Sequence, residues 1–523
     1  MGSYHHARIE YICSTRIEPI GVWSQLWKQL GDFGQDPKLR VLMSNLAYTA
    51  PGSHSRTDHL PARELRLSIL ATRSRIGPRE WIKLDHVHSC RIREASVNTC
   101  SIMDESSEMP DLWRFMSDLA AMESETPNIP PPRVIELPPS VPKLEEILSA
   151  NDFALAAQKA LTPKAWAFYS SAATDLVTVN KNRELIRRVM LRPRILRNVS
   201  SARIERKILG LDSKAPFIMC PAAMATLAHP DGELGWSRAA ASEGIFEIIS
   251  SNASYSLPSI IAAAPPGHPF FLQLYVNSNR SKTVELLRRA RSLGIKAIFV
   301  TVDAPVPGKR EADERAAQDV VIKSEMSGSE SSKDNKGSGL GRLMGQYIDK
   351  SLNWEDLKWI REESSVPIVL KGVQAVEDVK LAVEHSVDGV MLSNHGGRSL
   401  DGAQASILIL LEVRKRFPEA FQHLEIFIDG GFERGSDILK AIALGATAVG
   451  IARPFLYSLV YGQKGVEHLS QILKDELETS LRLAGLTSLD QATPDLVNTL
   501  DVDYLVPSGS AESCPMSSMR AKL

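Results

Sequence analysis

Short apolar runs recur along the chain from about residue 216, and each run ends in small or polar residues before a segment with helical spacing. Nearly every position within a run is apolar, as is typical of strands that are covered on both faces. Eight such runs occur, at residues 216–223, 246–252, 270–276, 297–303, 367–373, 389–395, 426–431 and 448–453. Eight buried strands that alternate with helices predict an α/β protein with a closed parallel (β/α)8 barrel, a TIM barrel.

A doubly wound open sheet is the alternative arrangement for alternating strands and helices. We favour the barrel because the runs number eight and because no G-x-G-x-x-G motif follows the first run. In a closed parallel barrel the carboxyl ends of all strands lie on one side, so the polar residues that end the runs are expected to line one site. These residues are Gln273, Tyr275, Thr301, Asp303, Lys371, Ser393, His395, Arg398, Asp429 and Arg453.

The regions outside the predicted barrel differ from it in composition. Residues 1–136 lack sustained periodicity and end in a proline-rich stretch that is typical of an extended linker. We assign no fold to this extension and expect part of it to be disordered. The barrel domain is expected at 137–506 and a flexible tail at 507–523. Within the barrel, the polar Gly/Ser-rich residues 324–339 predict a mobile loop at the strand-end face.

Composition narrows the possible partners. With 523 residues, of which 43% are hydrophobic, the chain can bury a large core. A formal net charge of -1 gives no general attraction for nucleic acid or anionic lipid, and no apolar stretch is long enough to predict a membrane span. The five cysteines are odd in number and form no C-x-x-C pair, which argues against a disulfide framework and a metal site. We expect small-molecule partners and a homo-oligomer.

The most informative segment is Ser393–Asp401, which follows the sixth run and reads SNHGGRSLD. His395 is a titratable base and Arg398 a permanent cation, and both are delivered to the same loop. A base beside a group that binds a carboxylate can take hydrogen from the carbon next to that carboxylate. Glycines and an arginine at the seventh and eighth strand ends are typical of a phosphate site in such barrels.

Several segments resemble the FMN-dependent 2-hydroxy acid oxidases and dehydrogenases, the family of glycolate oxidase, lactate oxidase and the flavocytochrome lactate dehydrogenases. The segments are Ser393–Arg398, Asp429–Gly431, Ala228–Glu233 and Gly308–Asp313, and they occur in the family's order. The resemblance runs from about Leu137 to about Val506. Residues 347–354 are most similar to the flavocytochrome branch, although the chain lacks that branch's His-Pro-Gly-Gly haem motif.

The resemblance implies a role for each residue of the site. His395 would remove a proton from the substrate and Asp303 would stabilise the imidazolium that forms. Lys371 would lie near N1 and the C2 oxygen of the flavin, where negative charge develops on reduction. The residues expected to bind substrate are Arg398, Arg310, Tyr275 and Phe168. The residues expected to bind FMN are Ala222, Ala223, Ser250, Gln273, Thr301, Lys371, Ser393, Asp429, Gly430, Gly431, Arg434, Ala452 and Arg453.

Three positions depart from the family pattern. Phe168 stands where the family has a tyrosine that contacts the substrate carboxylate, which favours a larger substrate with an apolar part on this ring. Glu433 stands where the family usually has a phosphate-binding arginine. A carboxylate about 4 Å from a phosphate costs on the order of 4 kcal/mol at an effective dielectric of about 20, so we expect Glu433 to turn away. Ala452 replaces a common glycine but keeps the backbone N–H.

The predicted function is therefore FMN-dependent oxidation of an (S)-2-hydroxy acid to the 2-oxo acid, with oxygen reoxidising the flavin. One alternative is an L-lactate-like dehydrogenase that passes electrons to a cytochrome or another acceptor. Another is a flavin-free barrel that only binds ligand, which Glu433 and Phe168 suggest. Residues Ala521-Lys522-Leu523 resemble a C-terminal peroxisomal address, so we expect the peroxisome, with cytoplasm or mitochondrion as alternatives.

Overall fold

The computed structural model describes residues 7–11, 40–42, 65–72, 129–317, 322–331 and 338–507, in two units, Met1–Trp113 and Arg114–Leu523. In the first unit, β3 (Leu65–Thr72) pairs antiparallel with β1 (Ala7–Tyr11) and with β2 (Arg40–Leu42). The sequence pattern did not predict these strands. The tail that carries Ala521-Lys522-Leu523 lies outside the described residues, so the peroxisomal address stays a prediction.

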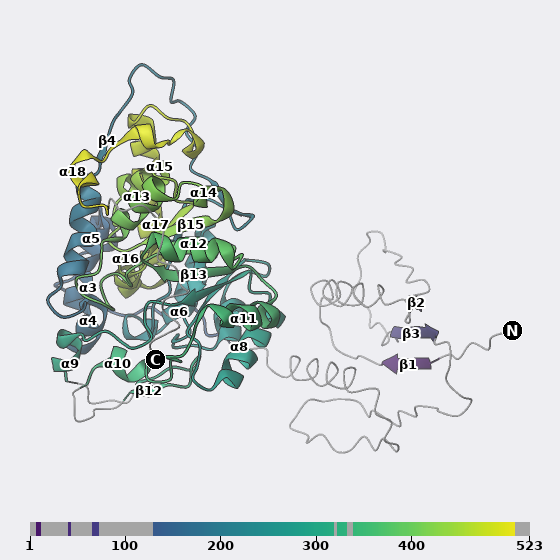
Figure 1. Ribbon diagram of the computed structural model, residues 1–523. Helices are drawn as coiled ribbons and strands as arrows, with labels where there is room; N and C mark the ends of the chain where they lie inside the picture. The colour runs from purple at the N-terminus through teal and green to yellow at the C-terminus, as the bar shows by residue number, and fades with distance from the viewer. Residues whose placement is uncertain are drawn as a thin grey trace, which may run out of the picture. The chain divides into compact units, whose positions relative to one another are not determined.

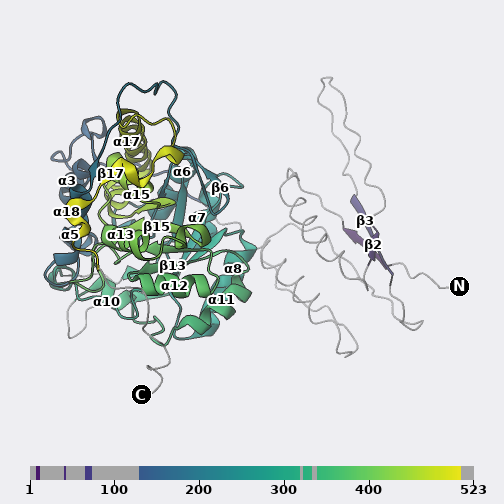
Figure 2. The same cartoon turned by 45° about the horizontal axis from the view of Figure 1, so that its top comes forward.

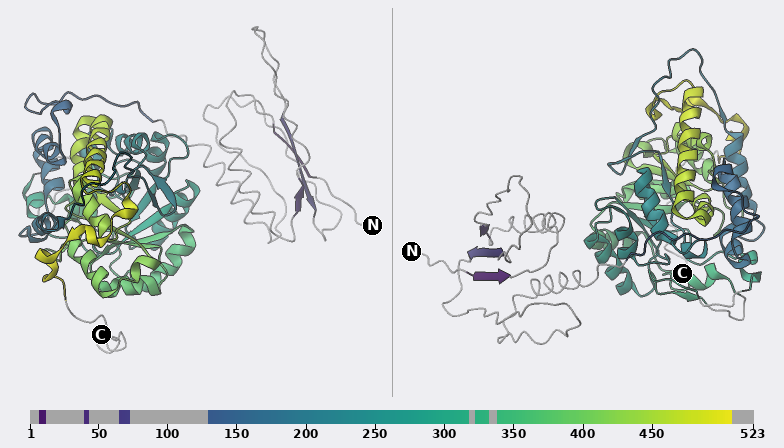
Figure 3. Two further views of the ribbon diagram at one scale, coloured as in Figure 1. Left: turned by 90° about the horizontal axis from the view of Figure 1, so that it is seen from above. Right: turned by 180° about the vertical axis from the view of Figure 1, so that it is seen from behind.

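Eight parallel strands of the second unit close into a barrel (Figures 1 and 3). This finding confirms the predicted (β/α)8 fold, and each of the eight apolar runs overlaps one strand, with β15 beginning one residue before its run. Around the barrel the order is β10-β13-β14-β15-β16-β7-β8-β9. The strands are β7 (Phe217–Met219), β8 (Phe246–Ile249), β9 (Phe271–Leu274), β10 (Ala297–Thr301), β13 (Ile368–Val373), β14 (Gly389–Leu392), β15 (Glu425–Asp429) and β16 (Ala448–Ile451).

Helices follow the strands and cover the outside of the barrel, with α8 and α11 side by side in Figures 1 and 2. The helices of this outer layer are α6 (Gly232–Glu243), α7 (Leu257–Ala263), α8 (Arg280–Ser292), α11 (Leu357–Ser364), α12 (Val376–Glu384), α13 (Ser406–Arg416), α14 (Ala420–His423), α15 (Gly435–Ala443), α16 (Arg453–Ser458) and α17 (Gly462–Leu483). No described helix is both long and apolar enough to cross a membrane.

The inside of the barrel is a packed core. Rings from neighbouring strands meet there: the centroid of Phe271 lies 5.1 Å from that of Phe246 and 5.6 Å from that of Phe299. The hairpin of β5 (Arg206–Ile208) and β6 (Leu211–Ser213) adds Ile208 to this cluster. The interior is therefore filled with side chains, and the open space lies at the strand ends.

Three helices before the barrel contribute to the strand-end side. They are α3 (Ala150–Ala160), α4 (Pro163–Ser170) and α5 (Val177–Arg188). Helix α4 begins where Thr162 accepts a hydrogen bond from the backbone N–H of Ala165, with proline in the first turn. Helix α3 packs on α16, and α5 packs on α13 and α15. This packing carries the end of α4 and one face of α5 to the carboxyl ends of the strands.

The long connection between β10 and β13 includes the loop predicted at residues 324–339, of which residues 332–337 lie outside the described residues. It contains α9 (Glu311–Arg315), the strand pair β11 (Ile322–Lys323) and β12 (Glu330–Ser331), and α10 (Leu340–Met344). Ser324 is fully buried, and its hydroxyl donates to the carbonyl of Ala253 at 2.8 Å. The polar composition had suggested that this segment cannot pack, but its hydroxyl groups find partners in the described part.

The short elements near the chain's end complete the unit. The strand β17 (Val497–Asn498) pairs antiparallel with β4 (Met190–Leu191), and α18 (Leu500–Asp503) follows it. Arg188 at the end of α5 donates to the carboxylate of Asp501 at 2.8 Å. The last described turn is thus attached to the same helix that carries residues to the strand-end face.

Candidate active site

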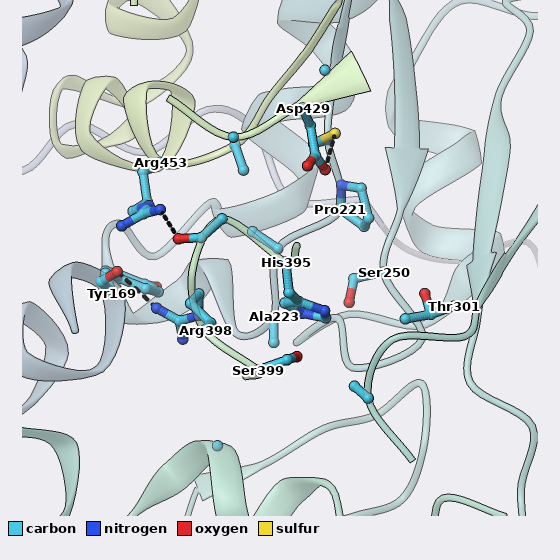
Figure 4. A pocket seen from close by; sticks show the side chains of 18 of the residues that line it. Tyr169, Pro221, Ala223, Ser250, Thr301, His395, Arg398, Ser399, Asp429 and Arg453 are labelled. Atoms are coloured by element: carbon cyan, nitrogen blue, oxygen red, sulfur yellow. Dashed lines mark hydrogen bonds between the residues drawn. The ribbon is translucent and has the colours of Figure 1, made fainter. Parts of the chain in front are cut away.

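One cavity opens at the carboxyl ends of the strands, and Figure 4 shows Arg398, His395, Thr301 and Asp429 around it. The structure brings most of the sequence-predicted site residues to its wall. Those that line it are Phe168, Ala222, Ala223, Ser250, Gln273, Tyr275, Thr301, Arg310, Lys371, His395, Arg398, Asp429, Gly430, Gly431, Ala452 and Arg453. Asp303 and Ser393 lie behind this wall and contact residues in it, whereas Arg434 lies elsewhere.

His395 is held between a carboxylate and a phenol. Its Nδ1 lies 2.9 Å from Oδ1 of Asp303, and its Nε2 lies 3.3 Å from the hydroxyl of Tyr275. A carboxylate can only accept, so Nδ1 carries the proton and Nε2 is left with a free lone pair. The Asp303 side chain is fully buried, while a quarter of the His395 side chain is exposed. The imidazole can therefore accept a proton from a ligand at Nε2.

The loop that carries His395 has an unusual backbone. His395 itself has a φ of 57°, and Gly396 and Gly397 continue with 61° and 76°. A Cβ on Gly397 would come within 2.6 Å of the backbone nitrogen of Val179 in α5, so this glycine is required by both conformation and space. A non-glycine residue in the left-handed region is costly and needs support from its surroundings. Packing against α5 provides that support and fixes the direction of the imidazole.

Tyr275 stays protonated in the working range of most enzymes. Burial raises the pKa of its phenol to about 12, and the nearby charge of Asp303 acts in the same direction. Its ring is parallel to that of His395, with an angle of 12° between the planes. The phenol can therefore donate a hydrogen bond to Nε2 or to a ligand oxygen beside it.

Two arginines flank Phe168 at the mouth of the cavity. The guanidinium carbons of Arg398 and Arg310 lie 5.4 Å and 5.8 Å from the centre of its ring. Arg398 donates through one nitrogen to the carbonyls of Phe168 and Tyr169 at 2.9 Å and of Ser171 at 3.0 Å, at the end of α4. These bonds fix the guanidinium and leave its other groups for a ligand.

Both arginines would gain from an anion. Burial lowers the pKa of Arg398 well below its usual value, and the charges of Arg310 and Arg453 lower it further. Burial also lowers the pKa of Arg310. No side-chain hydrogen bond joins Arg310 to a residue in the described part of the chain. The guanidinium lies against Gly341, where a Cβ would be 1.3 Å from its terminal nitrogen. A carboxylate between these groups would offset the cost of burying them.

Lys371 forms a second charged group on the floor of the cavity. Its ammonium donates to Oδ2 of Asp429 at 2.6 Å and to the hydroxyl of Ser393 at 3.2 Å. Burial is the largest effect and lowers the pKa of Lys371, but the charges of Asp429, Cys220 and Asp303 and the hydrogen bond to Asp429 together outweigh burial and raise it. The other oxygen of Asp429, Oδ1, is buried without a hydrogen-bond partner in the described residues. It is free to accept a bond from a ligand hydroxyl.

The expected phosphate end differs from the sequence prediction in two ways. Glu433, expected to turn away, lines the cavity and pairs with Arg183 of α5 at 2.6 Å. Arg434 does not line the cavity, because it begins α15 and its guanidinium pairs with Glu476 at 2.7 Å. Arg453 does line it and donates to the carbonyl of Gly396 at 2.5 Å. The cations at this end are therefore Arg453 and Arg183.

Residues that the sequence reading missed come from helices and loops. Arg183 lies on α5, more than 200 residues before the strand ends beside which it lines the cavity. The signal for it in the sequence was Glu433, a carboxylate at the expected phosphate end that needs a cation as its partner. Asn252 follows β8 and lines the cavity beside the expected residues. Its position at the end of an apolar run was visible in the sequence, but its direction was not.

The donor set fits FMN. Lys371 supplies a cation for the flavin end, the orphaned oxygen of Asp429 suits a ribityl hydroxyl, and Arg453 and Arg183 suit a phosphate. Gly430 and Gly431, with φ of 93° and 91°, let the backbone come close to such a group. The cavity therefore has the charges that this cofactor requires along its length.

Comparison with known proteins agrees with this fit. A family model described as FMN-dependent dehydrogenase matches residues 157–499. The chain is 41% identical over 364 residues to L-lactate dehydrogenase (cytochrome) from Wickerhamomyces anomalus, which covers 69% of this chain and 63% of that protein. It is 40% identical to glycolate oxidase 3 from Oryza sativa subsp. indica, covering 68% of this chain and 97% of that protein. The chain thus spans slightly less than two thirds of the yeast dehydrogenase.

Solved structures give the same result. The flavin-binding domain of baker's yeast flavocytochrome b2 superposes with a TM-score of 0.62 at 38% identity, covering 73% of this chain and 93% of that one. Mandelate oxidase with (S)-4-hydroxymandelic acid also superposes with a TM-score of 0.62, at 32% identity, covering 67% and 98%. These matches confirm the resemblance and favour an enzyme over the flavin-free binding barrel. The protein belongs to the FMN-dependent dehydrogenase family, and its cofactor is FMN.

Proposed function

We propose that the protein oxidises an (S)-2-hydroxy acid to the corresponding 2-oxo acid, with His395 as the base and oxygen as the acceptor. The observation that carries the proposal is the pair of His395 and Asp303 in a cavity that is also lined by the guanidinium groups of Arg398 and Arg310. Oxidation removes two electrons and two protons from the hydroxyl group and its carbon. FMN, when bound, would accept the two electrons together with one of the two protons, and His395 would take the other.

The residues of the chain would divide the remaining tasks. Arg398 and Arg310 bind the substrate carboxylate, which neutralises cations whose pKa values burial lowers. This contact places the hydroxyl-bearing carbon near Nε2 of His395 and the phenol of Tyr275. Nε2 accepts one proton, and Asp303 stabilises the positive imidazole through the bond at Nδ1. The proposed FMN contacts are Ala222, Ala223, Ser250, Gln273, Thr301, Lys371, Ser393, Asp429, Gly430, Gly431, Ala452 and Arg453.

The electron acceptor has two candidates. Oxygen is proposed because the sequence contains no His-Pro-Gly-Gly haem motif, and its reduction by two electrons and two protons gives hydrogen peroxide. A cytochrome is the second candidate, because the yeast relative at 41% identity is a cytochrome-linked dehydrogenase. The two reactions share the first half and differ only in reoxidation.

One experiment tests both halves. The visible spectrum of the purified protein is recorded without air before and after addition of L-lactate, glycolate and longer 2-hydroxy acids, and peroxide is then measured per substrate oxidised under air. We expect a flavin spectrum that bleaches with an acid and about one peroxide per substrate. Bleaching with almost no peroxide but fast reduction of an artificial dye would move the acceptor to a cytochrome. A flavin that no 2-hydroxy acid bleaches would contradict the proposed function.

A further inference from the structure

A buried amide lies in the cavity wall close to the segment that carries Tyr275. Asn252 follows β8, is only 6% exposed and lines the cavity. Its Oδ1 accepts a hydrogen bond from the phenol of Tyr347 at 3.2 Å. Among the described residues, none accepts a hydrogen bond from its Nδ2. This nitrogen is not among the buried atoms that lack a partner, so its two N–H groups reach the open cavity and can donate to water or to a ligand there.

The backbone around Asn252 is rigid. The preceding residue, Ser251, donates through its hydroxyl to the carbonyl of Gln273 at 2.6 Å and accepts from the backbone N–H of Tyr275 at 3.1 Å. The carbonyl of Asn252 accepts from the backbone N–H of Met224 at 3.1 Å. The amide is thus attached to the same segment as Tyr275, whose hydroxyl contacts His395. Its position relative to the base is fixed before any ligand binds.

Tyr347 fixes the direction of the amide. The backbone carbonyl of Tyr347 accepts from the N–H of Ser278 at 2.8 Å, so the segment is held against the chain that follows β9. Burial raises the pKa of the Tyr347 phenol, which keeps it protonated and able to donate to Oδ1 of Asn252. With Oδ1 occupied, Nδ2 is the group of Asn252 that remains for a ligand.

We propose that Asn252 determines the substrate, by donating a hydrogen bond from Nδ2 to a neutral oxygen on the side chain of the 2-hydroxy acid. The preferred substrates then carry a hydroxyl or carbonyl oxygen beyond C2. This inference rests on the proposed function. Neither Asn252 nor Tyr347 is hydrogen-bonded to a cation in the described part of the chain, and the neighbouring cavity residue Ile348 is apolar. A neutral oxygen therefore fits better than a second carboxylate.

The physical basis is the penalty for an unpaired donor. An apolar side chain beside Asn252 would displace water from the amide and return no hydrogen bond, whereas an oxygen at the same place would replace the water. A site built to hydrogen-bond a substrate group discriminates strongly against the analogue that lacks it. The expected discrimination is about 5- to 150-fold in the ratio of reduction rate to dissociation constant, since a donor left unsatisfied costs about 1–3 kcal/mol.

The test uses matched acids that differ by one oxygen. Flavin reduction is followed by stopped flow in the FMN-loaded protein, with L-lactate against L-glycerate and (S)-2-hydroxybutyrate against (S)-2,4-dihydroxybutyrate. In at least one pair we expect the oxygenated acid to have the higher ratio of reduction rate to dissociation constant, by at least about fivefold. Asn252→Leu should abolish this preference while flavin content stays the same. Asn252→Asp keeps the volume and the acceptor for Tyr347 but removes the N–H donors, so it should abolish the preference as well. It takes the place of the leucine variant if that variant does not fold.

Tyr347→Phe distinguishes recognition from a purely structural role. It keeps the N–H groups of Asn252 but removes the hydrogen bond that fixes their direction, so the preference should fall and part of it should remain. If it removes the preference as completely as Asn252→Leu, the amide acts only through Tyr347 and the inference fails. Equal reduction by both members of each pair would also overturn it, while leaving the proposed function intact. Reduction by none of the four acids, nor by glycolate, would instead contradict the proposed function itself.

Discussion

Oδ1 of Asp303 lies 2.9 Å from Nδ1 of His395, while its second oxygen, Oδ2, is buried without a hydrogen-bond partner in the described residues. The carboxylate is therefore committed to the imidazole. It fixes the tautomer that leaves Nε2 unprotonated and it stabilises the ring once a proton has been accepted. The orientation of the His395 imidazole is also maintained by the left-handed backbone of His395 and by the close approach of Gly397 to α5.

Replacing His395 by glutamine should abolish flavin reduction without releasing FMN. The side chain is of similar size and can still contact Tyr275, but it cannot accept a proton, so the reduction rate should fall by about 100- to 10,000-fold. Stopped-flow reduction by substrate, with the flavin-to-protein ratio from the visible spectrum, measures both properties. Photochemical reduction of the bound flavin serves as the control and should be unchanged. Activity within a few-fold of the original would exclude His395 as the base.

Gly341→Ala should weaken substrate binding through Arg310. A Cβ at this position would lie 1.3 Å from the terminal nitrogen of Arg310, so the guanidinium must move. Since a hydrogen bond to a charged group contributes about 1.5–3 kcal/mol, KM should rise by about 10- to 100-fold with a smaller effect on kcat. Gly235→Ala in α6 is a matched control, because its Cβ would meet neighbours only at 3.4 Å or more. An unchanged KM in Gly341→Ala would show that Arg310 does not bind the carboxylate.

Arg183 and Glu433 should have opposite effects on FMN affinity. Arg183→Gln removes a cation from the expected phosphate end and should raise the Kd for FMN by about tenfold, since part of this exposed charge is screened. Glu433→Gln removes a carboxylate that repels the phosphate and should lower the Kd, most clearly at low salt. Quenching of FMN fluorescence on addition to the apoprotein measures both constants.

Arg434→Gln is the control for this pair, because Arg434 pairs with Glu476 outside the cavity. Its Kd for FMN should match that of the unchanged protein. A tenfold loss of affinity in Arg434→Gln, with no loss in Arg183→Gln, would show that the phosphate lies on the other side of Glu433 and would restore the expectation drawn from the sequence.

Phe168→Tyr should tighten the binding of short 2-hydroxy acids. The ring lies within 6 Å of both guanidinium carbons, so a hydroxyl added at its tip would be placed beside the carboxylate that these groups are proposed to bind. The gain for lactate or glycolate should be about 10- to 100-fold in KM. A long acid whose apolar part packs on the ring should instead bind more weakly, because the hydroxyl would be unpaired. Equal kinetic constants for short and long acids in both proteins would show that residue 168 does not contact substrate.

Much of the barrel follows from the sequence alone. All eight strands were predicted, because a strand covered on both faces must be apolar along its whole length and polar where it ends. The convergence of Tyr275, Asp303 and His395 also follows, since parallel strands in a barrel end on one side. Asp303 and His395 are 92 positions apart in the sequence but share a hydrogen bond, because the ends of β10 and β14 lie close together with only β13 between them. The three strands of the first unit were not predicted.

What the sequence could not decide is the direction of a side chain and the identity of its partner. Arg434 and Glu433 are neighbours, yet only Glu433 lines the cavity, because the start of α15 turns Arg434 towards Glu476. Arg183 reaches the same end from α5, and Asn252 is oriented by the phenol of Tyr347. Apolar periodicity and strand ends are local properties of a chain. Charge pairing and the orientation of a buried amide depend on which helices and loops pack together, and the tertiary structure alone determines that.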